Sequence, residues 1–115
     1  MIHTHWELGR LTGEPVLTSH RTVGDLAGYW QDADAARAVA SRPLYSTYAY
    51  HPQPDGTPGA VLWGSTILHP GDVGGEYHMT RGHFHVDPTR GELIIVAQGT
   101  GELVLMTRDR QAHSV

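Results

Sequence analysis

The high density of glycine and proline is the feature that most constrains how this chain can fold. Fourteen Gly and seven Pro are spread over 115 residues. Glycine is conformationally free and proline lacks a backbone donor, so both interrupt regular secondary structure. The resulting short segments favour turns and strands over long helices. We therefore predict a mostly β fold, formed by one domain that covers residues 1–115.

The segments between these turns have the patterns expected of strands. Leu44–His51 is rich in Tyr and Thr, and the loop that follows, HPQPDGTPG, contains the residues that a hairpin connection requires. The further predicted strands are Ala60–Leu68, Glu76–Thr80, His83–Val86, Glu92–Gln98 and Leu103–Thr107. One short helix is predicted over Gln31–Ser41, an Ala-rich segment with Asp in its first turn that ends before Pro43.

Charge and cysteine content exclude several classes of protein. The formal net charge is -4 and the sequence contains no Lys, so the composition offers no basic surface for nucleic acid or an anionic membrane. Because cysteine is absent, any bound metal would need His, Asp or Glu ligands. No segment reaches the roughly 20 apolar residues that span a bilayer, and the N-terminus lacks signal-peptide features. We expect a soluble, cytoplasmic protein.

The segment RGHFHVDPTRGELIIVAQGTG (81–101) contains the residues best suited to chemistry. In a strand, His83 and His85 would point to the same face. The turn-forming residues 87–91 would let the chain fold back and place Glu92 opposite the two histidines. Two imidazoles and a carboxylate suit a divalent metal with open positions for a substrate. The alternative is that these are incidental surface histidines, because the chain has nine His in all.

The pattern His83-x-His85-x6-Glu92-x6-Gly99 resembles the first motif of the cupin superfamily. More narrowly, YHMTRGHFH resembles the cupin-type glucose-6-phosphate isomerases. The segments RTVGDLAGYW, LYSTYAY and STILHPGDVGGEY follow the same order, so the resemblance covers roughly residues 20–107. It implies a cupin-type (jelly-roll) β-barrel, incomplete here because this chain would form its N-terminal part.

The resemblance also implies a site, a reaction and a homodimer. His83, His85 and Glu92 match three metal ligands, with Fe2+ as the first expectation and Mn2+, Ni2+, Zn2+ or Co2+ as alternatives. Glu92 is also the candidate base for interconverting glucose 6-phosphate and fructose 6-phosphate, through an enediol or, alternatively, by hydride transfer. Residues that match contacts to the sugar phosphate are Tyr45, Thr66, Thr80, Arg81 and Gly82.

Two departures from the family pattern bear on activity. Ile94 stands where the family has a tyrosine, which removes a hydroxyl from the site. The chain also lacks the second cupin motif, Gly-x5-Pro-x4-His-x3-Asn, which supplies a fourth ligand, so Leu103–Thr107 is expected to have an unpaired edge. We therefore expect a truncated chain, a fragment, or a barrel completed by a partner. Histidines that could substitute for the fourth ligand, none of them favoured over an ordinary role, are His51, His69, His78 and His113.

Three other functions stay open at this point. The first is a degenerate or truncated cupin that binds a sugar phosphate or has a structural role. The second is another cupin metalloenzyme, such as a dioxygenase or a different sugar isomerase, since one fold hosts many reactions. The third is a small β domain in which the histidines have no chemical role.

Overall fold

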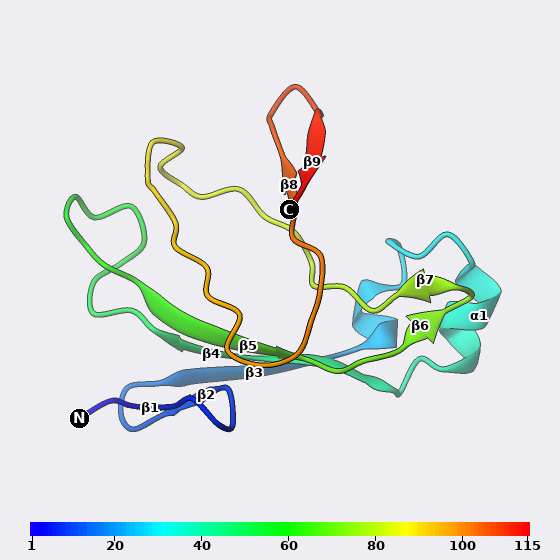
Figure 1. Ribbon diagram of the computed structural model, residues 1–115, viewed down its shortest axis with the longest axis horizontal. Coiled ribbons are helices and arrows are strands. Elements are labelled where there is room, and N and C mark those ends of the chain that lie inside the picture. Colours follow the sequence, from blue (N-terminus) through cyan, green and yellow to red (C-terminus); the bar gives the residue numbers. More distant parts are fainter.

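The computed structural model describes all residues from Met1 to Val115, and most of its regular structure is short strands (Figure 1). The mostly β prediction is confirmed. The strands form four small antiparallel sheets and do not close into a barrel, which is consistent with a partial cupin-like fold. The elements in chain order are β1 (His3–His5), β2 (Arg10–Thr12), β3 (Leu17–Thr22), the 3-10 helix η1 (Val23–Leu26), α1 (Ala33–Ala38), β4 (Pro43–Tyr50), β5 (Trp63–Leu68), β6 (Asp72–Val73), β7 (Glu76–Tyr77), β8 (Val104–Met106) and β9 (Ala112–Ser114).

The central sheet has three strands in the order β3-β4-β5. β4 lies in the middle, where its Tyr and Thr residues suit a pleated surface with neighbours on both sides. Thr47, for example, pairs with Ser19 of β3 and with Thr66 of β5. The predicted hairpin between the Tyr-rich segment and the apolar segment after it is confirmed as β4 and β5. β5 begins at Trp63 rather than at Ala60.

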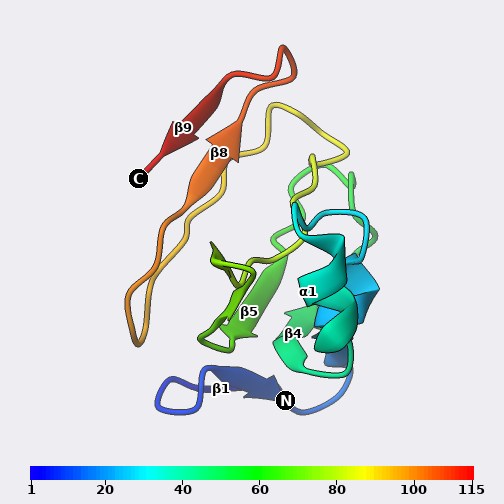
Figure 2. The ribbon, with the colours of Figure 1, turned by 90° about the vertical axis from the view of Figure 1, so that its right-hand side faces the viewer.

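The hydrophobic core lies where one end of this sheet meets the two short helices. The indole N–H of Trp30 donates to the Val23 carbonyl oxygen at 3.0 Å, which satisfies a polar group inside the core. The buried residues of the cluster are Val23, Leu26, Trp30, Ala36, Leu44, Tyr45 and Val73. They come from η1, α1, β4, β6 and the segment before α1, so these elements form one packed unit (Figure 2).

The predicted helix exists but is shorter than its sequence pattern indicates. Asp32 is the N-cap residue, and its side chain accepts hydrogen bonds from the backbone N–H groups of Asp34 and Ala35. At the other end, Val39 leaves the helical conformation, with φ −122°. α1 therefore covers only Ala33–Ala38 of the predicted Gln31–Ser41.

The C-terminal third differs most from the prediction. His83–Val86 and Glu92–Gln98 are not strands, and β7 covers only the first two residues of the predicted Glu76–Thr80. Residues 83–86 and 92–98 are not paired with any strand, and they run beside the sheet as irregular chain (Figure 1). The expected unpaired edge is present on one side only, because β8 pairs with β9 as a small antiparallel hairpin and with no other strand. That hairpin stands apart from the central sheet (Figure 2).

The helices of the structure are short, and none has the length and apolar character required to cross a membrane.

Candidate metal and sugar-phosphate site

The predicted turn between His85 and Glu92 is present and is built by local hydrogen bonds. The Asp87 carboxylate accepts from the Thr89 hydroxyl at 2.7 Å and from the Thr89 backbone N–H at 2.9 Å. These bonds favour the ionised carboxylate, so Thr89, through its hydroxyl first and its N–H second, holds the pKa of Asp87 below its ordinary value. The Arg90 N–H donates to the Asp87 carbonyl oxygen at 3.3 Å and closes the turn.

This turn brings two of the three predicted metal ligands together. The His85 Nε2 and Glu92 Oε2 atoms are 3.4 Å apart, and the imidazole rings of His83 and His85 have centroids 5.4 Å apart. The His85 side chain is 29% exposed and that of Glu92 is 54% exposed. The three side chains are neighbours of the right chemical types. As placed, however, no group of three or more His, Cys, Asp or Glu side chains has the arrangement that would hold a metal ion.

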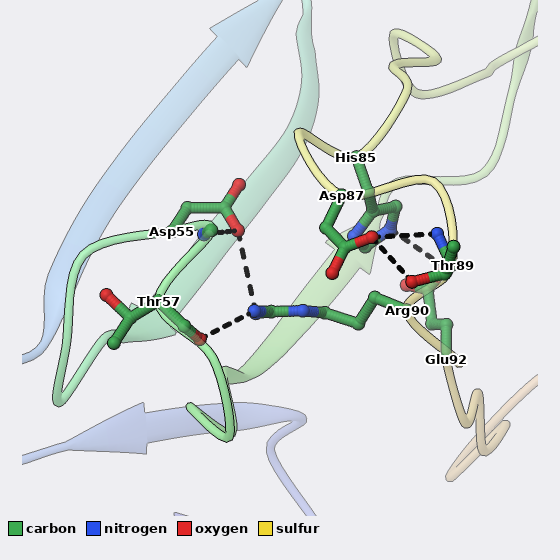
Figure 3. A network of polar contacts seen from close by, with 8 residues as sticks. Asp55, Thr57, His85, Asp87, Thr89, Arg90 and Glu92 are labelled. Carbon is green, nitrogen blue, oxygen red and sulfur yellow. Dashed lines mark hydrogen bonds and ion pairs between the residues drawn. The ribbon is translucent and has the colours of Figure 1, made fainter.

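Arg90 connects the turn to the loop between β4 and β5 (Figure 3). Its Nη2 donates to the Thr57 carbonyl oxygen at 2.9 Å, and its Nη1 lies 3.6 Å from Asp55 Oδ1. The Arg90 side chain is only 17% exposed. Sequence reasoning treated this arginine as one of several turn residues and did not identify its contacts, which join segments 33 residues apart.

The residues predicted to contact a sugar phosphate are divided between two environments. Thr80, Arg81 and Gly82 are exposed and directly precede His83. The Arg81 guanidinium lies over the Tyr29 ring, 5.6 Å from its centroid. Tyr45, in contrast, is only 8% exposed and belongs to the hydrophobic core.

Thr66 and Ile94 are both exposed. Thr66 is an exposed residue of β5, paired with Thr47 of β4. Ile94, which stands where a tyrosine was expected, is 49% exposed and lies outside the core. An open hollow of about 850 Å³ lies elsewhere, between the start of α1 and the β6–β7 turn, and contains none of the predicted site residues.

The other histidines considered as ligands lie away from the turn or serve the fold. His78 is buried, and its Nδ1 is 2.8 Å from the His69 carbonyl oxygen, to which it donates. Its ring also meets Trp30 edge-on, with centroids 6.5 Å apart. His113 lies in the exposed hairpin strand β9, and His51 is an exposed residue of the loop after β4.

The sequence of the chain places this site in a known family. The sequence model of the family described as "Glucose-6-phosphate isomerase (GPI)" matches residues 20–113, which include the whole turn and the residues before it. The chain belongs to this family.

Individual relatives support the assignment. Glucose-6-phosphate isomerase of Pyrococcus horikoshii is 31% identical over 115 residues, which cover 97% of this chain and 59% of that protein. Its counterpart in Thermococcus kodakarensis is 32% identical over 109 residues, covering 93% and 56%. A putative glucose-6-phosphate isomerase 2 of Rhizobium meliloti is 38% identical over 89 residues, covering 74% and 44%. The chain thus spans about half of the length of these relatives.

Proposed function

We propose that this chain is the part of a glucose-6-phosphate isomerase that carries its catalytic base, and that the protein interconverts glucose 6-phosphate and fructose 6-phosphate. The observation that carries the proposal is the family match over residues 20–113. These residues include His85 and Glu92, whose side chains lie close together. The named relatives are glucose-6-phosphate isomerases, which agrees with this reaction. We further propose that residues 1–115 form one cupin-like domain, the N-terminal part of a barrel.

We also propose that His83, His85 and Glu92 hold a divalent metal ion, with Fe2+ as the first candidate and Mn2+, Ni2+, Zn2+ or Co2+ as alternatives. Two imidazoles and one carboxylate are suitable donors for all of these ions. The 3.4 Å between His85 and Glu92 leaves these two near a shared position, whereas His83 would have to turn toward them. When bound, such an ion would polarise the oxygen atoms of the sugar.

The protein residues would bind the substrate and move the proton. Thr80, Arg81 and Gly82 would contact the phosphate, and Thr66 would contact the sugar from the central sheet. Tyr45 would have to turn out of the core to do the same. Arg81 can leave Tyr29, because an exposed cation–π contact is worth about 0.5–1 kcal/mol and hydrogen bonds to charged groups about 1.5–3 kcal/mol. Glu92 would take the proton from C2 of the open-chain aldose and return it to C1, while the proton of the O2 hydroxyl passes to O1; the intermediate is an enediol and the product is the ketose.

A coupled assay of fructose 6-phosphate conversion, with Fe2+ or Mn2+ added, tests the proposal. We expect Glu92→Gln to lower kcat by about 100-fold or more, the usual size of a general-base contribution. Glu102→Gln is the matched control, since Glu102 is an exposed glutamate of the same segment. Full activity in Glu92→Gln, or an equal loss in both variants, would remove Glu92 from the reaction.

A second candidate function is binding of a sugar phosphate without turnover. It is favoured by the absence of an assembled three-donor cluster, and by Ile94 at the position where the resemblance leads one to expect a tyrosine. Calorimetric titration with fructose 6-phosphate, run beside the turnover assay on the same sample, separates the two. Binding with no conversion under any of the five metals would favour this second function.

We also propose a homodimer and a cytoplasmic location for the protein. Sedimentation velocity over a range of concentrations tests the first, and fractionation of cells tests the second. A monomer at all concentrations would contradict the dimer.

A further inference from the structure

Two loops that are distant in the sequence meet beside the His85–Glu92 pair (Figure 3). One is the loop of residues 51–62 between β4 and β5, and the other is the turn of residues 85–92. Arg90 of the turn makes a charge-assisted hydrogen bond to the Thr57 carbonyl oxygen and lies close to the Asp55 carboxylate. Because the Arg90 side chain is largely shielded from water, this contact is stronger than an ion pair on an open surface.

A second contact joins the same two loops without involving Arg90. Gly56 has a positive φ of +86°, and a Cβ built on it would lie 3.3 Å from Cγ1 of Val86. The tip of the 51–62 loop therefore packs directly against the residue that follows His85. Gly59, three residues further on, has a similar φ of +76° but would meet nothing within 4 Å. The contact is thus specific to the part of the loop that faces the turn.

We propose that Arg90 is a positioning residue, which fixes His85 relative to Glu92 by clamping their turn to the β4–β5 loop. The bonds between Asp87 and Thr89 are local, so they shape the turn but do not hold it against the rest of the molecule. Arg90 supplies the polar part of that connection, beside the packing of Gly56 against Val86, and it lies between the two functional residues in the chain. The role of this clamp in a reaction rests on the proposed function of His85 and Glu92, but the clamp itself can be tested separately.

The first test uses the metal-free chain and replaces Arg90 by Gln. Arg42→Gln is the matched control, because Arg42 Nη1 also donates to a backbone carbonyl, that of Asp72, at 2.9 Å but far from the turn. Ring-nitrogen spectra of His85 and nuclear Overhauser contacts between Gly56 and Val86 are recorded at one fixed pH. We expect both signals to change in Arg90→Gln and to match the wild type in Arg42→Gln. Unchanged signals in Arg90→Gln would overturn the proposal.

Two further variants separate positioning from general destabilisation. Arg90→Lys keeps the charge and one donor nitrogen but loses the planar fork, so we expect its His85 signal to lie between those of Arg90→Gln and the wild type. Gly56→Ala must push Val86 away, whereas Gly59→Ala carries the same kind of backbone strain without a contact. Of the two glycine variants, only Gly56→Ala is expected to shift the His85 ring signal. A shift of equal size in Gly59→Ala would mean that the signal reports strain in the loop and would overturn the clamp.

Titration with Co2+ links the clamp to the proposed metal site. Residues that orient metal ligands change metal affinity by about 10- to 100-fold when they are replaced, so we expect a loss of at least about tenfold for Arg90→Gln. Arg42→Gln should bind as the wild type does. A wild-type chain that binds no Co2+ would contradict the proposed metal site, while the His85 signals would still decide whether Arg90 positions the turn. Wild-type affinity in Arg90→Gln would overturn the proposal.

Discussion

Replacing Gly71 with Ala should destabilise the fold much more than the same replacement at Gly75. Gly71 has φ +149°, and a Cβ at this position would lie 2.7 Å from Cε1 and 3.0 Å from Nε2 of His78. The first distance is shorter than any ordinary contact and the second is tighter than most, and both atoms belong to a buried ring. Gly75 also has a positive φ, +87°, but a Cβ there would have nothing within 4 Å. The pair therefore separates backbone strain from the clash with His78.

The size of the difference follows from what His78 would lose. Backbone strain costs about 1–3 kcal/mol at either glycine. At Gly71 the displaced ring would also lose its hydrogen bond to the His69 carbonyl oxygen, about 1 kcal/mol net, and overpacking adds about 1–3 kcal/mol. We expect Gly71→Ala to lower the free energy of unfolding by about 2–4 kcal/mol more than Gly75→Ala does.

Urea unfolding followed by tryptophan fluorescence measures this difference, because Trp30 lies against His78 in the core. A double variant tests the cause, since His78→Ala removes the ring that the new methyl group would meet. In the His78→Ala background, the extra cost of Gly71→Ala should disappear, which is a coupling between the two positions. Equal costs at Gly71 and Gly75, or strict additivity with His78→Ala, would refute the reasoning.

Two further predictions concern the core and the start of η1. Leu44→Ala should lower the free energy of unfolding by about 2–5 kcal/mol, because Leu44 is fully buried and its loss leaves a cavity; urea unfolding checks this. The Thr22 backbone N–H, and then its hydroxyl, hold the pKa of the Asp25 carboxyl below its ordinary value by donating to it. Asp25→Asn should therefore be less stable than the wild type near neutral pH, and the difference should fade as the pH drops from about 4 toward 2. A difference in Tm between them that stays constant from pH 7 to about 2 would contradict this assignment.

The parts of the fold that could be predicted are those specified by neighbouring residues. The β4–β5 hairpin has alternating strands around a loop of Pro, Asp and Gly, so its turn and its pairing are both local. β3, in contrast, has the sequence LTSHRT, which shows no apolar alternation and becomes a strand by pairing with β4. The segment Leu93–Val96 shows the opposite error. Its four residues favour strands, yet all are exposed and no strand pairs with them. Strand propensity describes how well a side chain suits a sheet, and it does not supply a partner strand.

The difference between local contacts and contacts with distant segments also explains why the site was predicted only in part. The turn that brings Glu92 near His85 is encoded locally, by Asp87, Thr89 and their hydrogen bonds. The clamp from Arg90 to Thr57 could not be read from the sequence, because its two ends are 33 residues apart and no periodicity connects them.

Bringing His83 into the site requires the segments before His85 and after Glu92 to pair as antiparallel strands, and this pairing is missing here. In an antiparallel hairpin with His85 opposite Glu92, the next pair on the same face is His83 opposite Ile94, with Cβ atoms about 4.5–5.5 Å apart. Pairing these two residues would fix the direction of the His83 imidazole and would also turn Ile94 toward the site. The absent three-donor cluster and the exposed Leu93–Val96 segment therefore have one physical cause, the lack of strand pairing beyond Glu92. Whatever completes that pairing would assemble the third donor and, in the same step, place an apolar side chain where the resemblance leads one to expect a tyrosine.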